Sequence, residues 1–170
     1  SDSWSRPVPA INPLMILFPE QISDERAIGG KARNLLSLTL ANFAVPPWFV
    51  ITDKEENIQN AYHKLCPDNE KVAVRSSGIE EDNSNHSFAG QFDSFLFVNS
   101  EDISEKVDAV QRSAKSTHLT AYRKVSGDGA KTPINIPAVI VQIMINPDAA
   151  GVVFTADPIT GHRDTCIISA

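Results

Sequence analysis

The sequence has few cysteines, no zinc-type spacing of ligands, no long apolar run and no excess of basic residues. Its 170 residues include only two cysteines, Cys66 and Cys166, which lie far apart and outside any Cys-x-x-Cys motif. This usage predicts free thiols in a reducing compartment, with a single disulfide as the alternative. The two cysteines and four histidines form no cluster of the zinc-finger type, so we predict no zinc site and no metal ligand.

Membrane and nucleic-acid binding are also disfavoured. No apolar run approaches the roughly 18 residues of a membrane-spanning helix, and there is no signal-peptide pattern. The formal net charge of −6 argues against a nucleic-acid footprint over the whole surface. We therefore expect a cytoplasmic protein in which any anion site is a local positive pocket. A glycosylation sequon at residues 85–87 leaves a secreted β-rich domain as a weaker alternative.

The composition is that of a globular protein with a core. Apolar residues make up 42% of the chain and charged residues 21%, which suits one domain or two small lobes. Residues 1–13 contain three prolines and are predicted to form a disordered lead-in. We assign residues 14–170 to a single domain.

Strands and helices are predicted to alternate along this domain, because period-two and helical patterns of apolar residues succeed one another. We expect strands at 14–18, 48–52, 72–77, 92–98, 138–145, 151–155 and 165–169. We expect helices at 30–42, at 53–65 with a cap at Thr52 or Asp53, and from about 100 to 125. Helical spacing places the following side chains on buried faces: Leu35 and Leu38; Ile58, Ala61, Tyr62 and Leu65; Ile103, Val107 and Val110.

A candidate phosphate site follows the strand that opens at Val72. This strand ends in Arg75, Ser76 and Ser77, and an acidic loop comes next. Arginine supplies a planar, permanently charged fork, and small residues allow backbone N–H groups and hydroxyls to approach phosphate oxygens. The alternative is a surface arginine beside an ordinary hairpin loop.

A second candidate cation lies at the start of a predicted helix. Gly29 and Gly30 precede Lys31, and a helix N-terminus carries free N–H groups and partial positive charge. The segment is not a P-loop, because Glu25 stands where the first glycine is needed and Ala32 stands where serine or threonine should follow the lysine. The alternative is a glycine turn before a helix with a solvated lysine.

Gln142 interrupts the β-branched run at 138–145. A buried glutamine needs partners for its amide, or it destabilises the strand by roughly 1–3 kcal/mol. Neighbouring backbone and a bound ligand are equally good candidates for that partner.

Five blocks in a fixed order carry a family resemblance. They are residues 29–35 (Gly-Gly-Lys-Ala-Arg-Asn-Leu), 45–52 (Val-Pro-Pro-Trp-Phe-Val-Ile-Thr), 74–91 with its Val-Arg-Ser-Ser, Glu-Asp and Ser-Phe-Ala-Gly-Gln motifs, 141–142 (Val-Gln), and 151–161 (Gly-Val-Val-Phe-Thr-Ala-Asp-Pro-Ile-Thr-Gly). Together they resemble the N-terminal ATP-binding domain of the phosphoenolpyruvate synthase and pyruvate phosphate dikinase family, which includes rifampicin phosphotransferase. The resemblance runs from about residue 15 to the end.

The resemblance implies an α/β (α+β) fold of the ATP-grasp type, in which two lobes hold ATP. It implies an ATP-dependent phosphotransferase that cleaves ATP to AMP. The phosphoryl group passes through a histidine on another domain to an acceptor. By position, Lys31 and Arg75 match residues that contact ATP phosphates, and Gly90 matches the glycine of the Phe-Ala-Gly-Gln loop. Ser94 falls where relatives often carry threonine near the nucleotide, and Gln142 matches a glutamine beside adenine, which favours the ligand as its partner.

Departures from the family pattern qualify this assignment. The chain stops at Ala170, before the Gly-Leu-Gly-Glu block and the acidic and glutamine residues that hold Mg²⁺ in relatives. The phosphohistidine and acceptor domains are also missing, and His162 lies in the wrong context to replace that histidine. The sequence thus predicts an ATP-grasp domain that is incomplete on its C-terminal side and inactive alone.

Three points of this interpretation stay open. A truncated or degenerate non-catalytic module is the alternative to an enzyme part. An exposed sheet edge would favour self-association. The acceptor, whether pyruvate, an antibiotic or a polysaccharide, is not determined.

Overall fold

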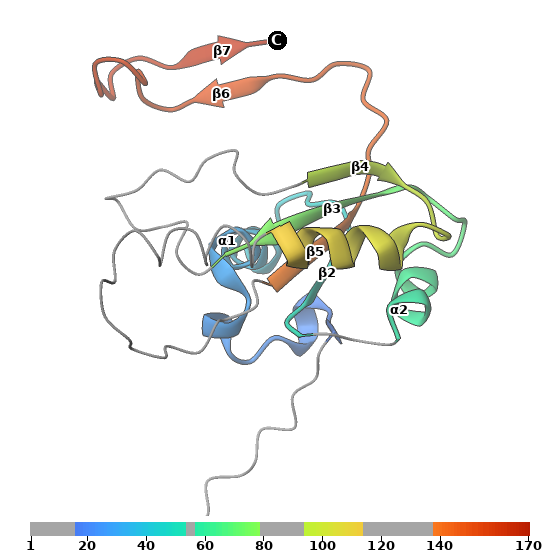
Figure 1. The fold of residues 1–170 in the computed structure, drawn as a ribbon. Coiled ribbons are helices and arrows are strands. Elements are labelled where there is room, and N and C mark those ends of the chain that lie inside the picture. Colours follow the sequence, from blue (N-terminus) through green and yellow to red (C-terminus); the bar gives the residue numbers. More distant parts are fainter. Residues whose placement is uncertain (1–15, 54–56, 79–93, 114–137) are drawn as a thin grey trace, which may run out of the picture.

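A computed structural model describes residues 16–53, 57–78, 94–113 and 138–170, and within them a five-stranded antiparallel sheet forms the centre. Its strand order is β1-β2-β5-β3-β4, so β5 lies between two strands that precede it in the sequence (Figure 1). The strands are β1 (Ile16–Leu17), β2 (Trp48–Ile51), β3 (Val72–Ser77), β4 (Ser94–Val98) and β5 (Ala138–Ile143). A separate two-stranded sheet pairs β6 (Val152–Phe154) with β7 (Ile167–Ser169).

Helices cover both faces of the central sheet (Figure 1). Helix α1 (Gly29–Leu40) packs on one face, which we call the α1 face. Helix α2 (Ile58–Leu65) and a helix described over residues 103–113 pack on the other, which we call the α2 face. Two short 3₁₀ turns, η1 (Pro19–Gln21) and η2 (Glu25–Ala27), lead from β1 into α1.

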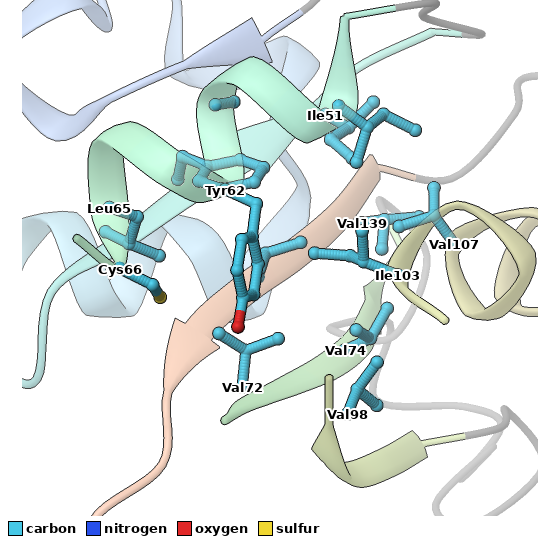
Figure 2. Packing of buried hydrophobic residues seen from close by; sticks show 14 of the residues in the cluster. Ile51, Tyr62, Leu65, Cys66, Val72, Val74, Val98, Ile103, Val107 and Val139 are labelled. Atoms are coloured by element: carbon cyan, nitrogen blue, oxygen red, sulfur yellow. The ribbon is translucent and has the colours of Figure 1, made fainter. Parts of the chain in front are cut away.

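The larger part of the core lies on the α2 face. Because successive strand residues point to opposite faces, Val72 and Val74 of β3 share this side with Val139 of β5. Tyr62 of α2 lies among them and is fully buried (Figure 2), and its hydroxyl donates a hydrogen bond to the Glu70 carbonyl oxygen at 2.6 Å. The result is an apolar layer in which the Tyr62 hydroxyl has a hydrogen-bond partner.

The α1 face carries a smaller apolar cluster. Ala32 and Leu36 of α1 are buried with Ile28, against side chains of β2 and β5 that include Trp48. The Trp48 indole N–H donates to the Thr39 hydroxyl at 3.2 Å, which ties β2 to α1. The cluster ends before it reaches β3, and the polar residues of β3 and β4 take over there.

Strand β4 contains a bulge. Val72 pairs with Val98, whereas Val74 pairs with Phe95, so the register shifts by one residue between these pairs. Phe97, inside the shifted stretch, has a φ of 56°, which a residue with a side chain adopts only at some cost. The bulge therefore changes which face the first residues of β4 present.

The hairpin of β6 and β7 stands away from the central sheet (Figure 1). Val153 and Ile168 face each other across it and are 57% and 70% exposed, respectively. Two-stranded ribbons with both faces open are marginally stable alone in water. This hairpin therefore contributes apolar surface that the described core does not bury.

Most predicted elements match the structure. All seven strands form, and the predicted buried faces of α2 and of the 103–113 helix are confirmed. The capping prediction is wrong, since α2 begins at Ile58 with Asn57 as its N-cap. The predicted face of α1 is also wrong in part, because Leu36 is buried and Leu38 is 42% exposed.

Some predictions fall outside the described residues. These are the disordered lead-in at 1–13, the start of β4 at 92 and 93, and the continuation of the third helix beyond 113. Among the described residues, Cys66 and Cys166 are both free thiols, the first buried and the second exposed. None of the helices in this part of the chain has the length and apolarity needed to cross a membrane.

Candidate functional site

Strand β3 sends its last three side chains to different places. Arg75 and Ser77 lie on the α1 face, and Ser76 lies between them on the α2 face. Arg75 is exposed, whereas both serines are buried, at 1% and 0% exposure. No salt bridge engages the Arg75 guanidinium within the part of the chain that the structure describes. The strand thus presents one open cation on the α1 face.

The N-terminus of α1 is bonded directly to the end of β3. The Gly30 N–H donates to the Gly78 carbonyl oxygen at 3.2 Å, and the Ala32 N–H donates to the Ser77 hydroxyl oxygen at 3.0 Å. A helix leaves its first N–H groups without partners inside the helix, so these two bonds supply partners from β3. The bond between Ala32 and Ser77 joins residues that are 45 positions apart in the sequence.

Gly29 permits this close approach. Its φ is +73°, and a Cβ built on it would lie 2.1 Å from the Ser77 carbonyl oxygen. Any other residue would therefore be strained at the backbone and would also collide with β3. In the structure, Ser77 fills the space that this glycine leaves open.

Lys31 lies between the two bonded positions, in the first turn of α1, and is half-buried. Arg75 precedes Ser77 by two strand residues, a distance of about 7 Å along β3. The structure therefore brings the segments that carry the two predicted phosphate-binding cations to the same edge of the α1 face. Whether both side chains bind one triphosphate stays a prediction.

Ser94 and Gln142 share this face with Arg75. Ser94 pairs directly with Arg75, because the bulge in β4 shifts the register. Gln142 lies on β5 two residues beyond Ile140, the direct partner of Arg75 on that strand, which makes it a diagonal neighbour at about 7–8 Å. Three of the predicted site residues thus form one patch across β4, β3 and β5.

The Gln142 amide already has a backbone partner. Its side-chain N–H donates to the Pro46 carbonyl oxygen at 3.2 Å, and the residue is half-buried. The expectation of a fully buried glutamine is therefore wrong, and neighbouring backbone supplies part of its hydrogen bonding. An amide has further donor and acceptor capacity, so this bond leaves room for a ligand.

The two serines do not play the role that the sequence suggested. Both were expected as small donors at the mouth of the strand, but Ser77 accepts a bond from α1 and Ser76 is enclosed on the α2 face. The physical reason is that β3 continues through Ser77 and is covered on both sides. Gly90, the remaining predicted site residue, lies outside the described residues.

The described residues hold no group of three or more histidine, cysteine, aspartate or glutamate side chains that would suit a metal ion. Magnesium prefers several oxygen ligands, usually including one or two carboxylates and the phosphates of its nucleotide. The residues of this face therefore do not fit Mg²⁺ by themselves, and we assign no magnesium ligand to them.

A polar surface pocket of about 430 Å³ lies elsewhere, lined by Tyr62, Asn69, Asn99, Ser100 and Glu101. The Ser100 hydroxyl donates to the Gln59 side-chain oxygen at 3.1 Å, and the Gln59 amide donates to the Ser100 carbonyl oxygen at 2.7 Å. These bonds link α2 to the turn before the 103–113 helix. The pocket lining therefore serves the fold.

Comparison with known proteins points to nucleotide chemistry. The model of a family described as "Pyruvate phosphate dikinase, AMP/ATP-binding domain" matches residues 53–170. The prodigiosin synthesizing transferase PigC of Serratia marcescens is 31% identical over 94% of this chain and 22% of its own length. A probable phosphoenolpyruvate synthase of Archaeoglobus fulgidus is 41% identical over 65% of this chain and 15% of its own length.

A rifampicin phosphotransferase from a Streptomyces species is 40% identical over 58% of this chain. The match covers 11% of that protein, so the chain spans about a fifth or less of the length of these relatives. The family match begins at residue 53, after α1, whereas the Serratia relative matches 94% of this chain.

Proposed function

Because the chain belongs to the pyruvate phosphate dikinase AMP/ATP-binding domain family, we propose that the α1 face binds the phosphates of ATP through Lys31 and Arg75. The family match confirms the predicted resemblance. With the mixed α/β architecture, it also confirms the predicted ATP-grasp-like fold class. The assignment of individual site residues is our proposal.

One observation carries it: the bonded contact between the start of α1 and the end of β3. This contact joins the helix turn that carries Lys31 to the strand that carries Arg75. Phosphoryl transfer depends mainly on positioning and on neutralising the phosphate oxygens, and a preset pair of cations supplies both. The partial positive charge of the helix N-terminus adds to the same edge.

The other residues of the patch take supporting roles in this proposal. The Ser94 hydroxyl, opposite Arg75, would hydrogen-bond the nucleotide. Gln142 would lie beside the adenine and use the amide capacity that Pro46 leaves open. Gly90, which lies outside the described residues, would contribute to nucleotide binding, as its match to the glycine of the Phe-Ala-Gly-Gln loop implies.

For the whole protein we propose an ATP-dependent phosphotransferase similar to phosphoenolpyruvate synthase. The names of the relatives support this activity, and they also show that acceptors differ within the group. The phosphoryl group would pass from ATP through a phosphohistidine on a further domain to the acceptor. Mg²⁺ would accompany ATP, with ligands outside the described residues. The division into a lead-in at 1–13 and a partial domain at 14–170, cytoplasmic residence and self-association also stay predictions.

Isothermal titration of ATP into the natural full-length protein tests the two cations. We expect Lys31→Ala and Arg75→Ala each to weaken binding about 10- to 100-fold, because each removes a charge-assisted bond to phosphate. Lys71→Ala is the matched control, since it removes an exposed cation just before the opposite end of β3.

The control variant should bind ATP within about 2-fold of the unmodified protein. Unchanged affinity in both Lys31→Ala and Arg75→Ala would overturn the proposed site. Equal losses in all three variants would mean that only the overall charge matters, which would also overturn it. Release of AMP from ATP, followed by chromatography, tests the proposed reaction separately.

A further inference from the structure

Ser77 is a buried serine whose hydroxyl is used by another element of the fold. Its side chain is 0% exposed, and its oxygen accepts the Ala32 N–H at 3.0 Å. Its carbonyl oxygen fills the space in front of Gly29. Both ends of this residue therefore face the first turn of α1, where Lys31 lies.

The contact fixes the position of α1 along β3. Ala32 follows Lys31 directly, and Gly30, which precedes it, donates to Gly78 at 3.2 Å. Lys31 is thus held on both sides by bonds to the end of β3. Arg75 belongs to the same strand and face, so the bonds fix the spacing between the backbones of the two cations.

Ser76 provides an internal comparison. It is 1% exposed and lies on the α2 face, and its hydroxyl has no hydrogen-bond partner within the described residues. The two adjacent serines are therefore equally buried and chemically identical, but only Ser77 contacts the helix that carries Lys31. Burial alone cannot explain a difference in their effect on ligand binding.

We propose that Ser77 is a positioning residue, which holds the first turn of α1, and with it Lys31, in place before the nucleotide arrives. The inference rests on the proposed function, because it acts through Lys31. Without the hydroxyl, the first turn of α1 loses one bonded partner and its lysine samples a wider range of positions. Ordering that lysine then reduces the affinity for the triphosphate.

The test is a double-mutant cycle on the natural full-length protein, with ATP affinity measured by titration calorimetry. Ser77→Ala should weaken ATP binding about 3- to 10-fold, the range expected for one neutral buried hydrogen bond. In a Lys31→Ala background the same change should have less than about a 2-fold effect. In an Arg75→Ala background it should keep its full effect. The ATP affinity of Ser76→Ala, the matched control, should stay within about 2-fold of that of the unmodified protein.

A local measurement accompanies the cycle. Amide hydrogen exchange at Ala32 without ATP should be at least about 3-fold faster in Ser77→Ala than in Ser76→Ala. If Ser77→Ala fails to fold, Ser77→Cys serves in its place, because a thiol is a weak acceptor in a similarly shaped side chain.

The outcomes separate the two hypotheses. If Lys31→Ala and Arg75→Ala leave ATP affinity unchanged, the proposed function fails. If they weaken it but Ser77→Ala does not, the positioning role alone is wrong. An equal Ser77→Ala loss with and without Lys31 would also overturn it, because the serine would then act by another route.

Discussion

The two faces of the central sheet differ in polarity and in the helices that cover them. The α2 face is apolar from β2 to β4 and is closed by α2 and the 103–113 helix. The α1 face is apolar only over β2 and β5, and it becomes polar at Arg75, Ser94 and Gln142. The same strands thus bury one side in the main core and carry the candidate site on the other.

The difference shows how a small domain can keep a charged site without losing its core. A buried charge is costly, whereas an exposed arginine at the margin of an apolar cluster is not. Alternation along β3 separates the two tasks residue by residue. Four substitutions and measurements test how complete the separation is, starting with the largest expected effect.

Phe49→Ala should damage the α2 face most. Phe49 is 0% exposed and packs 5.5 Å from the ring of Phe18, so its loss leaves a cavity. We expect the free energy of unfolding to fall by about 3–5 kcal/mol. Phe43→Ala makes the same chemical change at a side chain that is 65% exposed and should cost less than about 0.5 kcal/mol. Urea titration measures both, and equal losses would contradict the assigned core.

Gly29→Ala should break the contact between α1 and β3. Alanine would have to adopt a φ of +73° and would place its Cβ 2.1 Å from the Ser77 carbonyl oxygen. We expect a loss of about 2–3 kcal/mol from the backbone term and the displaced strand. Thermal unfolding monitored by circular dichroism checks this, and a neutral substitution would show that α1 does not lie against β3 as described.

Cys66 reports on how well the α2 face excludes solvent. Burial, with a smaller contribution from Glu70, raises the pKa of its thiol to about 11 from an ordinary value of 9.0. A raised pKa means that the unfolded chain loses this proton first. The stability it contributes is therefore complete below pH 9 and is lost as the pH rises toward 11.

Thiol labelling measures directly how well the α2 face shields Cys66 from solvent. A disulfide reagent at neutral pH should modify the exposed Cys166 quickly and Cys66 only after unfolding. Cys66→Ala should reduce the loss of stability between pH 9 and 11. Rapid labelling of both thiols in the folded protein would show that the α2 face is open.

The smallest effect is expected at Ser76. Ser76→Ala removes an unpartnered hydroxyl from an apolar face. It should change the free energy of unfolding by less than about 0.5 kcal/mol. Ser77→Ala, which removes a bonded oxygen, should cost about 1 kcal/mol. Denaturant midpoints of the two variants check the contrast, and a reversed order would invalidate the assignment of the serines to the two faces.

Local patterns in the sequence were sufficient to predict the strands and the buried faces of two of the three described helices. The spacing of Ile58, Ala61, Tyr62 and Leu65 is a property of neighbouring residues, so it can be read without a fold. The positions of Lys31 and Arg75 as candidate cations could be recognised in the same way, from a glycine-led helix and a strand end.

Contacts between distant segments could not be predicted in this way. Nothing near Ser77 indicates that its hydroxyl meets Ala32, because the pairing depends on how α1 crosses the sheet. For the same reason Gly29 could be recognised as the start of a helix, but its close contact with Ser77 could not. The partner of Gln142 is a proline carbonyl 96 residues earlier in the chain.

The extra residue in β4 has an evolutionary consequence. With the Val72–Val98 register continued unchanged, Phe95 would lie opposite Arg75 in place of Ser94. Closing the bulge at unchanged strand length would invert the parity of the first residues of β4 and put an aromatic ring next to the guanidinium. A relative can therefore keep a hydroxyl at this point either with the bulge or with a strand that is one residue shorter, whereas a relative of equal length without the bulge loses it, even where every motif on either side is intact.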